Sequence, residues 1–290
     1  MMKRILAGIG VSFIALTGGS GCNNLFTDMS NKTSDQAIMD NATNLINAQL
    51  YTDAIAELGL MSTAGQASAQ GKILFATANA GAGGLNLINL SNTLSGSGNP
   101  STLFLTLLKA FAGNNQNSFN YQIAAEGYIM SIAPAAANRT NDENLFMVFV
   151  ELAKLGTLMA FTADPLGTGT VDATFTTSCS LTQAEADQVV TALAIIMDSM
   201  TALGTNALSS SLPSNFTTCS GPLGLLCGLT TVASVAAVPD AEQIGKTLVG
   251  ESALGIGLKV QPGICEIASG GPCPGNTFPA QGLQEWCGFP

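Results

Sequence analysis

The chain has no histidine among its 290 residues. Without an imidazole it cannot form a Ser-His-Asp triad or a Cys-His pair, and it lacks the side chain that most transition-metal sites use. No other grouping of residues in the sequence specifies a reaction. We therefore expect a protein that is not an enzyme and that uses no catalytic residues, no metal ion and no cofactor.

Charged residues are also scarce. They make up 10% of the chain, whereas 47% of the residues are hydrophobic, a balance that excludes intrinsic disorder. The 19 acidic residues outnumber the 9 basic ones, which gives a net charge of -10. A chain this acidic lacks the basic surface that binds nucleic acids and anionic lipid headgroups. We expect no nucleic-acid partner, and any attachment to a membrane has to be hydrophobic or covalent.

Signals for β-strands are rare as well. No alternation of apolar and polar residues is sustained, and Val, Ile and Thr seldom cluster. Apolar residues instead recur three and four positions apart, which indicates helices. We predict an all-α fold of antiparallel helix hairpins, with helices near residues 34–49, 52–61, 67–80, 85–94, 101–111, 119–133, 141–161, 180–204 and 240–250.

Some helix ends can be predicted from capping residues. Ser34 and Ser101 stand where an N-cap is expected, and Ser180 or Thr182 precedes the clearest helix. Glu185 lies three residues after Thr182 and would complete a capping box with it. Gly204 is expected to end that helix.

The first 21 residues have the three parts of an export signal. A positive start, the apolar run ILAGIGVSFIALT and the small residues GGSG follow one another. The run is 13 residues long, too short for a membrane span of ~20 residues. We assign residues 1–21 to a signal peptide, and its removal would bring the net charge to -12.

Cys22 comes directly after this leader. Ser20, Gly21 and Cys22 resemble the lipobox of bacterial lipoproteins, in which a diacylglycerol is attached to the cysteine. Gly19 departs from the pattern, because the family usually has Leu three residues before the cysteine. The resemblance implies a lipid anchor, with its palmitate, on Cys22. The alternative is an ordinary secretory leader beside an incidental cysteine.

Polar residues without periodicity follow the anchor. Residues 22–33 are therefore expected to be a tether. By similarity to enterobacterial sorting, Asn23 after the cysteine implies the outer membrane, facing the periplasm. The expected location is the bacterial cell envelope.

The six other cysteines all lie in the second half of the chain, and six can pair. In an oxidising compartment they indicate up to three disulfides, with Cys227 and Cys287 among the candidates. A turn of Gly and Pro residues makes Cys265 and Cys273 the first pairing, and a second joins two cysteines in similar surroundings, Cys179 and Cys219. No CxxC motif accompanies them, which argues against zinc.

Two apolar segments raise the question of a membrane span. Residues 145–161 contain Glu151 and Lys154 near their centre, which is costly in hydrocarbon. Residues 221–238 carry no charge but are rich in small residues, and we favour a buried helix over a span there. We divide the mature body into a helical domain, 34–218, and a Cys/Gly/Pro-rich segment, 219–290, packed on it.

The stretch NATNLINAQLYTDAIAELGLM resembles a degenerate tetratricopeptide repeat. Ala42 occupies the small position of the first helix, and Tyr51 precedes the near-obligate Ala54 of the second. The usual proline after the second helix is absent, since Gln66 stands there, and no second copy follows at the family's period. The next segment, ASAQGKILFATANAGAGGLNLINL, is similar to uncharacterised bacterial lipoproteins of this helical-repeat type. The alternative is an ordinary helical hairpin.

The resemblance implies an α-solenoid-like body that binds a protein partner. We expect a non-enzymatic, membrane-anchored periplasmic lipoprotein that holds a protein or an envelope assembly component on its helical surface. The side chains expected on the binding face are apolar, aromatic or amide residues of the predicted helices: Tyr51, Leu58, Phe75, Asn79, Tyr121 and Tyr128.

Two other classes of function remain open. The chain also resembles the auxiliary component of some solute transporters, which would bind a small ligand in an apolar pocket between helices. An enzyme would require four carboxylates to converge in a cleft: Asp142, Glu143, Asp164 and Glu151. The pairs at helix starts, including Glu185 and Asp187, are better explained by the helix dipole.

Overall fold

The computed structural model describes residues 33–96, 103–172, 181–204 and 228–238. Within these ranges it contains helices and no strand, so the all-α prediction is confirmed. The elements are α2 (Asp35–Asn47), α3 (Tyr51–Leu58), α4 (Thr63–Ala67), α5 (Ala69–Ala82), α6 (Leu87–Gly96), α7 (Leu103–Ala110), α8 (Gln116–Ile132), η2 (Ala136–Asn138), α9 (Asn141–Ala163), α11 (Gln183–Leu203) and α12 (Val232–Ala236).

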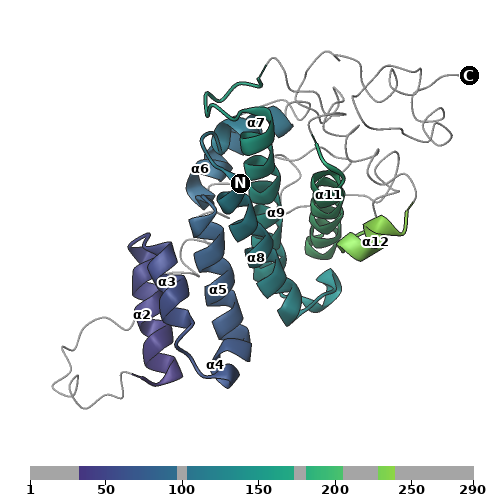
Figure 1. The fold of residues 1–290 in the computed structure, drawn as a ribbon. Coiled ribbons are helices and arrows are strands. Elements are labelled where there is room, and N and C mark those ends of the chain that lie inside the picture. The colour runs from purple at the N-terminus through teal and green to yellow at the C-terminus, as the bar shows by residue number, and fades with distance from the viewer. Residues whose placement is uncertain (1–32, 97–102, 173–180, 205–227, 239–290) are drawn as a thin grey trace, which may run out of the picture.

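The helices form a series in which each packs against the next. Helix α2 packs on α3, α3 on α5, α5 on α8, α8 on α9, and α9 on α11 (Figure 1). The short pair α6 and α7 interrupts the chain between α5 and α8, and α7 packs on α9. The small helix α12 packs on α11. The six main helices, α2, α3, α5, α8, α9 and α11, therefore follow one another in space in the same order as in the chain.

Capping residues explain why several helices begin and end where they do. The Oγ of Ser34 accepts a hydrogen bond from the amide of Ala37, as predicted. Thr182 and Glu185 form the predicted capping box, and Gly204 ends α11 with a φ of 77°. Thr140 makes a second capping box at the start of α9. These contacts satisfy backbone amides that the first turn of a helix leaves unpaired.

Helix α8 begins three residues earlier than predicted. The side chain of Asn115 accepts hydrogen bonds from the amides of Asn117 and Ser118, at 2.9 and 3.2 Å. An asparagine in this position starts a helix even where the following residues are polar. The helix ends before Pro134, as expected from the missing amide of proline.

The described core consists of two clusters of buried apolar side chains. The smaller one lies among α2, α3 and the first part of α5. The larger one runs from α5 through α8 and α9 to α11 and α12. Helices α9 and α11 contribute most to it, and most of their residues are buried. The partly buried Tyr128 touches both clusters.

Residues 228–238 are the described part of the segment 221–238, in which we predicted a buried helix. Among them only Val232–Ala236 is helical, and residues 228–231 before it are not. Gly228 has a φ of 82°, a backbone conformation that interrupts regular helix. In this described part the helix is therefore short, and Val235 on it is buried.

Two described helices, α9 and α11, are long and apolar enough to cross a membrane, and up to three spans result if the bent pair of Ala69–Ala82 with Leu87–Leu94 is counted as one. This assessment rests on length and composition alone. In the structure both long helices are largely covered by their neighbours.

Other predictions fall on residues outside the described ranges. These are the leader 1–21 and most of the tether, the cap Ser101, the helix near residues 240–250, and all seven cysteines.

Candidate functional site

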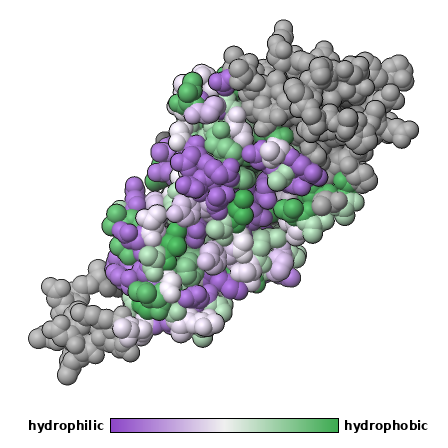
Figure 2. Space-filling view, viewed as in Figure 1, coloured by the Kyte–Doolittle hydropathy of each residue, from purple (hydrophilic) through white to green (hydrophobic). Residues whose placement is uncertain are grey.

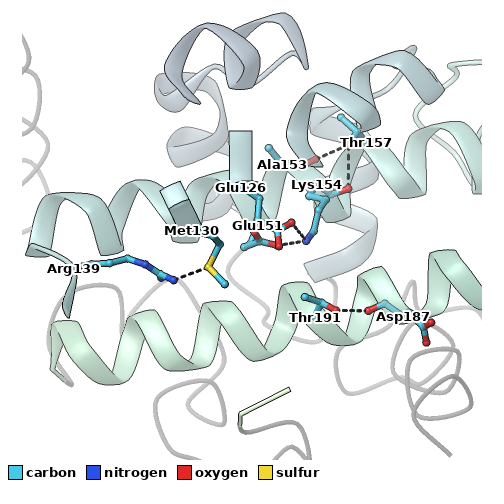
Figure 3. A network of polar contacts seen from close by, with 9 residues as sticks. All are labelled: Glu126, Met130, Arg139, Glu151, Ala153, Lys154, Thr157, Asp187 and Thr191. Atoms are coloured by element: carbon cyan, nitrogen blue, oxygen red, sulfur yellow. Dashed lines mark hydrogen bonds and ion pairs between the residues drawn. The ribbon is translucent and has the colours of Figure 1, made fainter. Parts of the chain in front are cut away.

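Helices α8 and α9 bring three charged side chains together inside the protein. The Nζ of Lys154 on α9 lies 2.6 Å from Oε2 of Glu126 on α8, and it donates a hydrogen bond to that oxygen. It also lies 2.6 Å from Oε2 of Glu151, which is three residues earlier on α9 (Figure 3). One ammonium group is thus held between two carboxylates from neighbouring helices.

All three side chains are removed from solvent to different degrees. The side chains of Glu151 and Lys154 are 0% and 1% exposed, and that of Glu126 is 14% exposed. Glu126 is therefore the side of the cluster that faces water. Inside a protein an unpaired charge is costly, so the mutual pairing of these groups is what makes their burial tolerable.

The surroundings shift the pKa values of the buried pair. Burial acts to lower the pKa of Lys154, but Glu151 and Glu126 together raise it above its ordinary value. Burial and, next, the charge of Glu126 raise the pKa of Glu151 to about 8, although Lys154 and Arg139 oppose this change. Burial thus favours the neutral form of Glu151, while the two carboxylates favour the charged form of Lys154.

Glu151 shares the ammonium of Lys154 with Glu126, since both carboxylates have an oxygen 2.6 Å from Nζ. The contact with Lys154 lowers the pKa of Glu151 and so opposes the effect of burial. Burial has the larger effect, because it removes the water that would stabilise the charged form.

Arg139 joins this region to the end of α8 and to α11. Its Nε and Nη2 donate to the backbone carbonyls of Ala133 and Pro134, at 2.8 and 2.7 Å. Its Nη1 donates to Oγ of Ser199 on α11 at 3.3 Å, and Nη2 lies 2.8 Å from Sδ of Met130 (Figure 3). The guanidinium therefore ties the carbonyl end of α8 to the neighbouring helix.

The charge of Arg139 is balanced at a distance. Burial lowers the pKa of Arg139, and Glu151 and Asp198 oppose this effect most. Burial in turn raises the pKa of Asp198, against the opposite effect of Arg139. An arginine stays protonated in proteins, so it remains a fixed positive charge beside the cluster.

The predicted binding face does not exist as one exposed surface. Leu58, Phe75 and Asn79 are buried, so they are corrected to core positions. The Nδ2 of Asn79 donates to the carbonyl of Phe75 on its own helix at 2.8 Å. This bond gives the buried Nδ2 group a partner in place of water.

The three tyrosines of that face are partly exposed. The ring of Tyr128 stacks on Phe75, and the ring of Tyr51 covers Gly81 on α5 so closely that a side chain there would collide with it. Tyr121 lies on α8 without such a contact among the described residues. Its burial is intermediate, as is that of Tyr51 and Tyr128.

The four carboxylates that an enzyme hypothesis would require are spread along α9. Asp142 and Glu143 lie in its first turn, Glu151 in its middle, and Asp164 directly after its end. A helix of this length covers roughly 30 Å, so the groups cannot meet in one cleft. Asp164 accepts hydrogen bonds from the amides of Thr168 and Gly169, which fixes a turn.

Among the described residues no group of histidine, cysteine or carboxylate side chains could hold a metal ion. Large apolar side chains that reach the surface are spread over different elements: Leu50, Leu60, Ile88, Leu166 and Val232. On the face drawn in Figure 2, polar and apolar residues are interspersed.

The contact between Glu126 and Lys154 is the feature that sequence reasoning missed. Glu151 and Lys154 were noticed only as a cost to a membrane span. Their spacing on an apolar helix was a signal of a buried pair. Glu126 lies 28 residues away, and nothing local links it to them.

The chain matches no protein-family model, no curated protein and no solved structure.

Proposed function

We propose that the protein is a lipid-anchored lipoprotein of the bacterial cell envelope whose helical stack binds a protein partner. The observation that supports this proposal is the series of helices in which each main helix packs on the next, together with the predicted leader 1–21 directly before Cys22. Extended helical stacks offer a long surface to a partner and need no catalytic group.

The arrangement of the helices in pairs supports the proposed resemblance to a helical-repeat protein. The pairs α2–α3, α5–α8 and α9–α11 follow one another, with α6 and α7 inserted in the second pair. In the first pair Ala42 and Ala54 are fully buried, as the resemblance to a tetratricopeptide repeat requires. The contact of Tyr51 with Gly81 adds an aromatic ring against a small residue where the first pair meets the second.

The interior supports surface binding over enclosure of a small ligand. A continuous cluster of buried apolar side chains joins α5, α8, α9 and α11. We infer that the partner contacts the outer side of the stack near Tyr121, and that a basic surface on the partner complements the net charge of -12 on the mature chain.

The anchor is tested by replacing Cys22 with Ser. We expect the wild-type protein to carry a lipid on a mature N-terminal Cys22, as measured by intact mass, and to remain in the membrane fraction. The variant should lose the lipid mass and leave the membrane. Ser20→Ala, which keeps a small residue before the cysteine, is the matched control. Retention of the Cys22→Ser variant in membranes would contradict the anchor.

Partner binding is tested by crosslinking and purifying the anchored protein from detergent-solubilised envelopes. A partner captured by the wild type should be lost with Tyr121→Ala and kept with Thr52→Ala, an exposed position on α3. The circular dichroism of both variants should match the wild type. Equal capture by Tyr121→Ala would remove Tyr121 from the proposed surface, and no stable partner at all would contradict the function.

A further inference from the structure

Three ionisable side chains contact one another where α8 packs on α9: Glu126 on α8, and Glu151 and Lys154 on α9. We call these three residues the cluster. Arg139, in the segment between η2 and α9, acts on Glu151 by its charge, and Asp198 on α11 acts in turn on Arg139. The cluster therefore joins α8 to α9.

The charges of this cluster do not balance when every group is ionised. Two carboxylates, those of Glu126 and Glu151, hold the single ammonium of Lys154, so the net charge of the triad is -1. One proton on a carboxyl makes the cluster neutral, which is the cheaper state inside a protein. Glu151 is the carboxyl group best placed to hold it, because its side chain is fully buried, whereas that of Glu126 is 14% exposed.

The other ionisable groups on the packed elements are not among the charges that act on Glu151, although Glu143 in the first turn of α9 acts on Arg139. Helix α7 carries Lys109, which is exposed, and the N-terminal turns of α9 and α11 carry Asp142 and Glu185. Tyr121 and Tyr128 lie on α8, and Asp187 on α11 points away from the cluster in Figure 3. The charges that act on Glu151 most are Glu126, Lys154 and Arg139.

We propose that this cluster is a one-proton switch at the seam between α8 and α9: the proton on Glu151 keeps the seam closed, and its release accompanies opening of the seam. The proton leaves as Glu151 becomes hydrated, and hydroxide or water accepts it. Water reaches the site past Glu126, the one member of the triad whose side chain is partly exposed.

The position of the cluster determines what such an opening would change. Helices α2, α3, α5 and α8 lie on one side of the seam, and α9, α11 and α12 lie on the other, with α7 packed on α9. The Nζ of Lys154 crosses it to Glu126, whereas Arg139 holds the end of α8 to α11. Opening is therefore expected in the middle of α8 and α9 and not at the tethered end. If a partner binds across both sides of the seam, opening would alter the surface that it contacts. This consequence rests on the proposed function.

The test is hydrogen exchange of the full mature chain, followed by mass spectrometry and corrected for the intrinsic effect of pH. In the open state Glu151 has its ordinary pKa. The equilibrium constant for opening therefore rises about tenfold per pH unit, until the pH reaches the pKa that Glu151 has in the closed state. We expect exchange in the middle of α8 and α9 to rise from about pH 5.5 and to level off near pH 8, where Glu151 has lost its proton in the closed state. Exchange in α2 and α3 should not follow this trend.

Glu151→Gln keeps the shape of the neutral carboxyl and cannot release the proton, so its exchange in α8 and α9 should be independent of pH over this range. Asp53→Asn, an exposed carboxylate of α3, is the matched control and should behave as the wild type. Infrared spectra should show a protonated carboxyl group in the wild type that disappears near pH 8 and is missing in Glu151→Gln. The same pH trend in Glu151→Gln as in the wild type, or an equal trend in α2 and α3, would overturn the proposal.

Glu126→Gln gives a second test if Glu151→Gln does not fold. It removes the carboxylate that raises the pKa of Glu151, so the levelling of exchange should move to a pH lower by about one unit or more. An unchanged midpoint in Glu126→Gln would also overturn the proposal, because it would show that the titrating group lies outside this cluster.

Discussion

The ring of Tyr128 on α8 stacks on the ring of Phe75 on α5, with centroids 4.8 Å apart and an angle of 6° between their planes. Phe75 belongs to the smaller core cluster, and Tyr128 packs against both clusters. The stack is thus a joint between the N-terminal hairpin and the rest of the described protein. Its loss should affect both parts at once.

We expect Tyr128→Ala to lower the free energy of unfolding by about 2–4 kcal/mol, because it removes a large ring from a packed site that is partly exposed. Urea unfolding followed by circular dichroism measures this loss. Tyr128→Phe keeps the stacked ring and is the matched control, with an expected change below about 1 kcal/mol. A loss of similar size in both variants would show that the hydroxyl, and not the stack, provides the stability.

Lys154→Met should lower the free energy of unfolding far more than the substitution of an exposed lysine. It leaves Glu126 and Glu151 beside each other without the cation between them, and removing one partner of a buried pair costs about 3–5 kcal/mol. Lys72→Met is a suitable comparison, since its Nζ donates to the carbonyl of Ser131 at an exposed position.

The triple variant Lys154→Met, Glu126→Leu, Glu151→Leu should recover much of that loss, because no unpaired charge remains in the core. Urea unfolding of the single and triple variants under the same conditions measures the recovery. If the triple variant were less stable than Lys154→Met, the ionic contacts themselves would be favourable and the argument from burial would be wrong.

Protein stability should depend on pH through Glu151. Its pKa is about 8 in the folded protein and near its ordinary value of 4.5 in the unfolded chain, so the folded state binds more protons between these values. Stability therefore falls as pH rises through this window, by up to about 1.4 kcal/mol per pH unit, and the slope ends near the folded pKa.

The contribution of Glu151 is isolated by subtracting the stability of Glu151→Gln from that of the wild type at each pH. Lys154 remains charged throughout this window, because its raised pKa lies above it. We expect the difference to fall between about pH 5 and pH 8. A difference that is constant over this range would mean that Glu151 is ionised in the folded protein at neutral pH.

The features that the sequence predicted correctly are those that neighbouring residues determine. Ser34 caps the first described helix, and Thr182 with Glu185 forms a capping box, because each contact lies within one turn. The position of Leu58 and Phe75 depended on which helices pack around them, and periodicity alone does not identify an exposed side. They were therefore placed on a surface that the structure replaces with core.

The buried cluster illustrates the same limit at the candidate site. Glu151 and Lys154 are three residues apart, and their pairing could be inferred from the sequence. Glu126 joins them only because α8 packs antiparallel to α9 at one particular register, which no local pattern specifies. The pKa of Glu151 depends on that contact, so the site could not have been derived from the sequence.

Gly156 on α9 allows the close approach of Phe111. A side chain at this position would collide with the aromatic ring, which is itself buried. We expect Gly156→Ala to lower the free energy of unfolding by about 1–3 kcal/mol, despite the better helix propensity of alanine. Gly127→Ala on α8 is the matched control, since nothing lies within 4 Å of the added carbon there, and it should stabilise the protein by about 0.5–1 kcal/mol. Equal effects of the two substitutions in urea unfolding would contradict the close packing.

The turn between α2 and α3 contains a residue that is poorly suited to its conformation. Gln49 has a φ of 62°, in the left-handed region. The amide of Leu50 donates to the carbonyl of Leu45, and the amide of Gln49 donates to that of Ile46, both at 2.9 Å. This is the hydrogen-bond pattern of a Schellman motif, in which glycine is the preferred residue at the left-handed position.

The end of α5 provides the comparison within the same chain. Gly84 has a φ of 87°, and the amides of Leu85 and Gly84 donate to the carbonyls of Ala80 and Gly81 in the same pattern. Glycine relieves the strain that a side chain causes at this position. We therefore expect Gln49→Gly to raise the free energy of unfolding by about 0.5–1 kcal/mol.

Ala48→Gly is the control for this last substitution. Ala48 is the preceding residue and has a φ of -82°, which alanine adopts without strain. There glycine only adds freedom to the unfolded chain, so stability should fall by about 0.5–1 kcal/mol. Urea unfolding of the two variants should therefore give changes of opposite sign. Destabilisation by Gln49→Gly would show that the side chain of Gln49 contributes more to the turn than its left-handed backbone costs.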